Sequence, residues 1–195
     1  MRELRNVEEK ILDRALYLIG KNHSCSISVR AIAKEAGVNV SAINYYFRSK
    51  EEMLRQAKEL YITNTLSITE ILNRTEYGNE ERLVFSANEI MEYNIRFPGI
   101  TFLLKDAREN GDDISKKVLE VSQEMTDGIN LILDDFIGSK GRDIQYKRMI
   151  FWASINYPIE VNGFSQFDSE ILEVKETRLT YINNLLHMLK MKLDY

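Results

Sequence analysis

The chain has 195 residues and a formal net charge of −4, and 44% of its residues are apolar. This composition supports a sizeable core, and the length fits one large domain or a small domain joined to a medium one. No apolar run is longer than five residues, which excludes a membrane-spanning helix.

Cys25 is the single cysteine, so no internal disulfide can form, which fits a reducing compartment. The N-terminal stretch MRELRNVEEKI contains no hydrophobic secretory segment. We therefore expect a soluble, cytoplasmic protein.

Charge is distributed unevenly along the chain. Residues 1–60 contain 11 Lys and Arg against 8 Asp and Glu, which gives +3, whereas residues 61–195 contain 15 against 22, which gives −7. A mildly basic N-terminal part on an acidic remainder suggests that only the N-terminal part contacts a polyanion.

Apolar residues recur at steps of three and four along most of the chain, and no alternating run is long enough for a sheet. The pattern predicts an all-α fold, with the first helix ending near Gly20, a break at Pro98-Gly99 and an irregular connector over 158–169. In chain order we expect helices over 4–20, 29–36, 40–47, 50–73, 81–97, 100–109, 114–137, 144–157 and 170–192.

Two short helices that meet at Gly37 have the spacing of a helix-turn-helix. Ser28 and Asn39 are suited to cap the two helices, and Ser49 is suited to cap the one that follows. Ala33 provides the small side chain needed where the helices cross, and four residues later Gly37 provides the positive φ of the turn. The apolar positions expected to fill the space between the helices are Ile32, Ala36, Val38 and Ile43.

The second helix of such a unit enters the DNA major groove with its N-terminal part toward the bases. Ile43 and Phe47 are four residues apart and share one face, which we assign to the core. The side chains on the other faces are candidates for base contacts, and the hydroxyl and basic groups nearby are candidates for phosphate contacts. The predicted DNA-binding residues are Ser28, Arg30, Val40, Ser41, Ala42, Asn44, Tyr45, Tyr46 and Lys50.

Other interpretations remain open for several of these side chains. Tyr46 is equally explained as a half-buried core residue with a hydrated hydroxyl. Asn44 is also explained as a solvated helix residue, and Lys34 and Arg48 as ordinary surface charges.

Residues 7–54 resemble the N-terminal domain of the TetR family of bacterial transcriptional regulators. The resemblance is carried by ILDRALYLIG and by SISVRAIAKEAGVNVSAINYYFRSKEEML, including its closing Phe-x-Ser-Lys-Glu-Glu-x-Leu pattern. This sequence departs from the family at Asn44, where many members have tyrosine, and at Ser41, where many have glycine. The mode of DNA binding is therefore carried over, but the operator preference is not.

The resemblance implies a helix-turn-helix DNA-binding domain over residues 1–50. A linking helix then leads into a helical domain over 51–195 that binds an effector and dimerises. The last two long helices, about 145–157 and 170–192, are the candidates for dimerisation, although their apolar stripes are also explained by internal packing. Apolar and aromatic residues on the middle helices could line an effector pocket, or simply form the core. These are Phe85, Tyr93, Phe97, Phe102, Met125, Ile129, Trp152 and Tyr157.

Signals of catalysis are missing from the sequence. His23 and His187 lie far apart, one cysteine cannot form a thiolate metal cluster, and there is no glycine-rich phosphate loop or nucleophile elbow. We expect neither an enzyme nor a metal or other cofactor. The hypothesis is a homodimeric repressor that a small-molecule effector releases from a palindromic DNA operator. The alternative is a helical small-molecule-binding or scaffold protein whose N-terminal domain docks on another protein.

Overall fold

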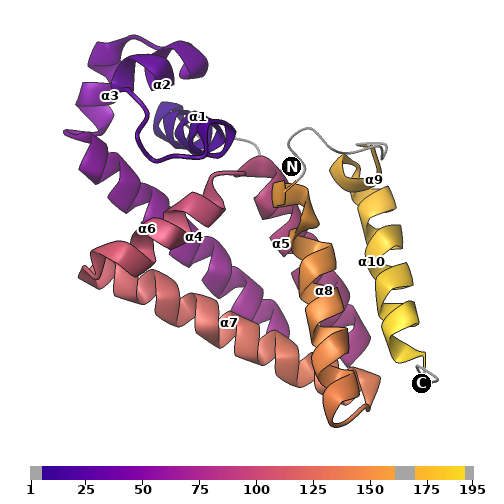
Figure 1. Cartoon of the computed structure of the whole chain (residues 1–195). Coiled ribbons are helices and arrows are strands. Elements are labelled where there is room, and N and C mark those ends of the chain that lie inside the picture. Colours follow the sequence, from indigo (N-terminus) through magenta and orange to yellow (C-terminus); the bar gives the residue numbers. More distant parts are fainter. Residues whose placement is uncertain (1–5, 161–169, 192–195) are drawn as a thin grey trace. The chain divides into compact units, whose positions relative to one another are not determined.

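The computed structural model describes residues 6–160 and 170–191, and the regular secondary structure of these residues is helical (Figure 1). This confirms the all-α prediction. The helices in chain order are α1 (Val7–Asn22), α2 (Val29–Ala36), α3 (Val40–Tyr46), α4 (Lys50–Leu72), α5 (Asn79–Arg96), α6 (Ile100–Asn110), α7 (Asp113–Ile137), α8 (Arg142–Glu160), α9 (Glu170–Glu173) and α10 (Lys175–Lys190).

The C-terminal helix differs from the prediction because it is divided at Val174, whose backbone is extended. Arg178 explains the interruption. Its Nη1 donates to the carbonyl oxygens of Leu172 at 2.8 Å and Glu173 at 3.3 Å, so these groups are satisfied without a continuous helix. Helix α8 is also longer than expected, and most of the predicted connector, residues 161–169, lies outside the described residues.

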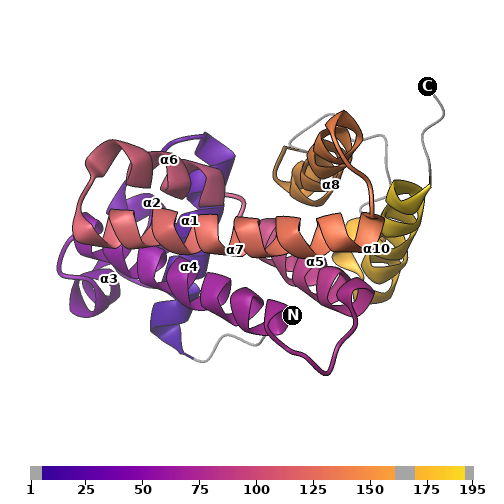
Figure 2. The same cartoon turned by 90° about the horizontal axis from the view of Figure 1, so that it is seen from below.

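Gly20 was expected near the end of the first helix, but α1 continues past it to Asn22 and His23 provides the left-handed cap. The glycine is needed for packing instead. A Cβ atom on Gly20 would lie 2.6 Å from the carbonyl carbon of Pro98, and one on Gly99 would lie 2.3 Å from the carbonyl oxygen of Leu16. Helix α1 and the start of α6 therefore approach at backbone distance, and Figures 1 and 2 show them side by side.

The chain packs as two compact units. The first comprises the chain up to Asn64 and residues 96–121, and the second comprises residues 65–95 and the chain from Ser122 onward. The boundary falls within α4 and within α7, so each of these helices contributes to both units. The functional division at residue 50 stays a prediction.

The core of the first unit is built from the apolar faces of α1 to α4 and α6. A buried ion pair accompanies it, in which Arg96 Nε donates to Asp13 Oδ1 at 3.1 Å. The largest fully buried apolar side chains of this unit are Ile11, Leu16, Ile19, Ile32, Phe47, Met53 and Leu103.

The second unit has its own apolar core, formed by α5, α8, α10 and the segments of α4 and α7 that belong to it. Two buried cations fasten its helices together. Arg178 donates to Asn88 Oδ1 at 3.0 Å and to Glu92 Oε2 at 2.9 Å, which joins α10 to α5. Lys147 donates to the Met191 carbonyl oxygen at 2.9 Å, which joins α8 to the end of α10.

Candidate nucleic-acid interface

Helices α2 and α3 have the local geometry of a helix-turn-helix. Ser28 caps α2, since its Oγ accepts from the Ala31 amide at 3.1 Å. Gly37 ends the helix at φ 65°, in the left-handed region, and the Val38 amide donates to the Ala33 carbonyl at 3.0 Å. The predicted capping and turn residues are therefore confirmed, and they set the direction in which α3 begins.

Helix α3 is held to the core by one of its faces. Asn39 Oδ1 accepts from the Ala42 amide at 2.7 Å and caps the helix. Ile43 is 2% exposed and Phe47, which follows the helix, is 1% exposed. The predicted core face of α3 is thus confirmed, although Val38 is only partly buried.

The opposite side of α3 faces solvent. Ser41 and Asn44 are exposed, and Tyr45 has 82% of its surface exposed. Tyr46 is half-buried and meets the Tyr45 ring edge-on, with ring centroids 5.1 Å apart. An apolar ring presented to water on a short, anchored helix suits contact with another macromolecule.

Basic side chains surround this surface. Arg30, Lys34 and Arg48 are exposed and Lys50 is half-buried at the first residue of α4, whereas Glu35 is the single acidic residue between positions 28 and 50. Residues 28–50 therefore have a positive formal charge, which suits contact with a polyanion, although Glu51 and Glu52 follow directly.

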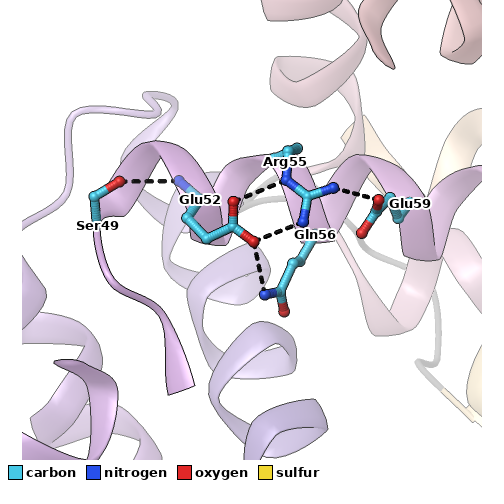
Figure 3. A network of polar contacts seen from close by, with 5 residues as sticks. All are labelled: Ser49, Glu52, Arg55, Gln56 and Glu59. Carbon is cyan, nitrogen blue, oxygen red and sulfur yellow. Dashed lines mark hydrogen bonds and ion pairs between the residues drawn. The ribbon is translucent and has the colours of Figure 1, made fainter. Parts of the chain in front are cut away.

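The start of α4 carries a polar network that sequence analysis did not identify (Figure 3). Ser49 Oγ accepts from the Glu52 amide at 3.1 Å and caps the helix, as predicted. The Glu52 carboxylate accepts from Arg55 Nε at 2.8 Å and from Gln56 Nε2 at 3.0 Å, while Arg55 also donates to Glu59. These hydrogen bonds, chiefly the one from Arg55, lower the pKa of Glu52 to about 2. Arg55 is thus paired with two carboxylates of its own helix.

The predicted effector-binding residues are divided between the two units. Phe97 and Phe102 belong to the first unit, and the others whose side chains are described belong to the second. Ile129 is fully buried in the core, and Trp152 donates to Asn130 Oδ1 at 2.9 Å. Phe85 is partly exposed and packs edge-on against Tyr77. The side chain of Tyr157 lies outside the described residues, and the set as a whole stays a prediction. Its members in the second unit are Phe85, Tyr93, Met125, Ile129 and Trp152.

The described residues were also searched for metal sites and for membrane-spanning helices. Within residues 6–160 and 170–191, no group of three or more His, Cys, Asp or Glu side chains is placed to hold a metal ion. No helix in this part of the chain combines the length and the apolar character needed to cross a membrane.

Known proteins match the chain in both sequence and fold. Residues 11–57 match the family described as bacterial regulatory proteins, tetR family. Two relatives from Bacillus subtilis (strain 168) are the uncharacterized HTH-type transcriptional regulator YuxN and the probable HTH-type transcriptional regulator YttP. YuxN is 29% identical over 126 residues, which are 65% of this chain and 39% of that protein. YttP is 33% identical over 92 residues, which are 45% of this chain and 44% of that protein. The chain thus spans less than half the length of either relative.

Solved structures match over nearly the whole chain. A TetR-family transcriptional regulator from Bordetella parapertussis 12822 has a TM-score of 0.68 at 15% identity, covering 94% of this chain and 95% of that one. The TetR-family regulator PfmR from Thermus thermophilus has a TM-score of 0.62 at 17% identity, covering 91% and 97%. FadR from Bacillus subtilis, solved in complex with stearoyl-CoA, has a TM-score of 0.54 at 19% identity, covering 94% and 98%.

The fold and the surface around α3 define a helix-turn-helix protein with a larger all-helical remainder. The family match over residues 11–57 includes α2, the turn and α3. The N-terminal part of the chain is therefore similar to the TetR family of bacterial regulatory proteins.

Proposed function

We propose that the protein is a DNA-binding transcriptional regulator that acts as a homodimer, and that a small-molecule effector releases it from a palindromic operator. The observation that carries this proposal is the division of α3 into two faces. Ile43 and Phe47 anchor the helix, while Asn44 and Tyr45 are exposed to solvent in a stretch that contains several basic residues.

On DNA, α3 would lie in the major groove. The small side chains at its start, Val40, Ser41 and Ala42, let the helix backbone approach the bases, and Asn44 can make a bidentate contact with adenine. The flanking groups would bind phosphates and set the register of the helix. The residues proposed for this role are Ser28, Arg30, Tyr45, Tyr46 and Lys50.

Helices α8 and α10 support the proposed dimer. They lie side by side within the second unit (Figure 1). Met149 on α8 is 65% exposed, Ile150 and Tyr146 are exposed nearby, and Met188 on α10 is exposed as well. A two-fold pairing of the two helices from each subunit would form a four-helix bundle and remove these apolar groups from water.

Effector control would act on the spacing of the two α3 helices in the dimer. We propose an apolar or aromatic effector, because aromatic residues are frequent on the middle helices, and we place its site in the C-terminal helical part. The effector must bind the form that releases DNA more tightly than the form that holds it, since otherwise it shifts no equilibrium. Helix α4 is the proposed route, because it is continuous from the first unit into the second.

Selection of bound fragments from random double-stranded DNA tests the proposal. We expect an inverted repeat whose half-sites are about 34–36 Å apart, one helical turn, or a multiple of this distance. Binding should weaken steeply with salt, because phosphate contacts release counterions. Failure to enrich any sequence, together with salt-insensitive binding of a protein partner, would favour the alternative of a protein-docking domain.

Replacing Tyr45 with alanine should weaken binding to the selected DNA by about 1 kcal/mol, or roughly fivefold, because a hydrogen bond to phosphate is lost. The free energy of unfolding should stay unchanged, since the side chain is exposed. Fluorescence anisotropy titration with labelled DNA measures the effect. Tyr45→Phe separates the hydroxyl from the ring, and wild-type affinity in both variants would remove Tyr45 from the interface.

A further inference from the structure

Lys58 is a cation in the interior of the first unit. The residue is 4% exposed and lies on α4, two turns after its start. Its Nζ donates to Ser115 Oγ at 2.8 Å and lies 2.8 Å from Asp106 Oδ2 and 3.9 Å from Asp112 Oδ2. These partners are 48 to 57 positions away in sequence, on α6, at the start of α7 and between the two.

A buried ammonium group is stable only if it keeps its partners, because taking the charge out of water is costly. Any motion that separates α4 from α6 would leave this charge unpaired. Asp112 is itself held in place, since its Oδ1 accepts from the Ser115 amide at 2.7 Å and caps α7. The distance between α4 and the α6–α7 corner is therefore tied to the Lys58 contacts.

The other end of α6 is fixed to α1. Gly99 approaches the backbone of α1 at Leu16, and Arg96 pairs with the buried Asp13. Helix α6 thus contacts α1 at its start and α4 near its end. The contact between α6 and α4 is the ion pair of Asp106 with Lys58.

The ionic contact is open to solvent on one side. Side chains of α4, α6 and α7 line a groove of about 720 Å³ that includes Lys58, Asp106 and Asp112. The side chains of Asp106 and Asp112 are 24% and 53% exposed. Water can therefore solvate the two carboxylates when they leave Lys58, so the contact can open without unfolding the unit.

We propose that Lys58, Asp106, Asp112 and Ser115 form an ionic latch that positions α4, and through it the DNA-binding helix-turn-helix, against the α6–α7 corner. The inference rests on the proposed function. Lys58 is a positioning residue, because it acts through α4 and does not itself contact DNA. Opening the latch gives α4 more freedom, and DNA binding must then remove that freedom at a cost in affinity.

The test compares four single variants of the 195-residue chain with the wild type, using the DNA sequence selected above. Lys58→Met should accelerate amide hydrogen exchange in α6 and in residues 113–121, and should weaken DNA binding about tenfold. Asp106→Asn should have a similar effect, whereas Asp106→Glu keeps the charge and should retain wild-type affinity. Lys105→Met is the matched control, because it makes the same lysine-to-methionine change on α6, the helix of Asp106, at a side chain that is 70% exposed. The DNA affinity of this variant should change less than twofold.

The double variant Lys58→Met with Asp106→Asn separates positioning from stability. It removes the buried ammonium and its nearest carboxylate together, and the remaining Asp112 side chain is 53% exposed to water, so its thermal midpoint should recover toward the wild type. Its DNA affinity should stay as low as that of Lys58→Met, because the latch is still absent. The latch would be overturned if the double variant recovered its DNA affinity together with its thermal midpoint. It would also be overturned if Lys58→Met had wild-type DNA affinity or unchanged hydrogen exchange. If the wild type itself selects no DNA, the proposed function fails, and the latch as a positioner of a DNA-binding helix fails with it. Hydrogen exchange in Lys58→Met then shows separately whether the ionic contact holds α6.

Discussion

Replacing Phe47 with alanine should lower the free energy of unfolding by about 3–5 kcal/mol, the cost of removing a buried aromatic ring and leaving a cavity. Phe47 is 1% exposed and directly follows α3. Because stability totals are about 5–15 kcal/mol, a loss of this size removes a large part of the total, and DNA binding should weaken to the extent that unfolded molecules accumulate. Denaturant titration followed by circular dichroism measures the loss.

Tyr45→Ala is the matched control for Phe47→Ala, since the two residues are neighbours with opposite exposure. The Tyr45 variant should keep wild-type stability and lose affinity, whereas the Phe47 variant should lose stability first. A Phe47→Ala protein within about 1 kcal/mol of the wild type would contradict the assignment of this residue to the core, since large truncations in a core cost more.

Replacing Gly99 with alanine should destabilise the protein by about 3 kcal/mol and lower Tm by roughly 6–12 °C, since overpacked sites must shift backbone to fit. The added Cβ would lie 2.3 Å from the Leu16 carbonyl oxygen and 3.0 Å from Ile19 Cβ. Neither neighbour is the free end of a flexible side chain, so α1 must move away from α6. Differential scanning calorimetry gives the change in Tm.

Gly78→Ala is the comparison for Gly99→Ala. The nearest atom to a Cβ at Gly78 would be Glu81 Oε2 at 3.7 Å, an ordinary contact. This variant should stay within about 0.5 kcal/mol of the wild type. Equal Tm values for the two alanine variants would show that the close approach of α1 and α6 does not constrain the fold.

Much of the helix-turn-helix could be predicted because its determinants are local. Ser28, Asn39 and Ser49 accept from amides three residues onward, so a single short stretch of sequence contains both partners. The faces of α3 follow in the same way from the four-residue spacing of Ile43 and Phe47. The other positions of α3 could then be assigned to its exposed side.

Sequence patterns could not identify the buried cations. The residue types of Lys58, Lys147 and Arg178 predict exposed side chains, because lysine and arginine are almost never fully buried without partners. Each has at least one acceptor far away in the sequence: Met191 for Lys147, 44 positions on, and Glu92 and Asn88 for Arg178, 86 and 90 positions back. The break at Val174 involves the same arginine, which donates to the carbonyl oxygens of Leu172 and Glu173.

The sequence by itself determined the helices, their caps and the two faces of α3, because these depend on side-chain spacing and on hydrogen bonds that span one helical turn. The tertiary structure decided where helices meet. Gly20 could be read as a helix end until the backbone of Pro98 and Gly99 was found against it, and Lys58 as a surface charge until Asp106 and Ser115 were found around it. Contacts between distant residues depend on how the whole chain packs, and no local pattern contains that information.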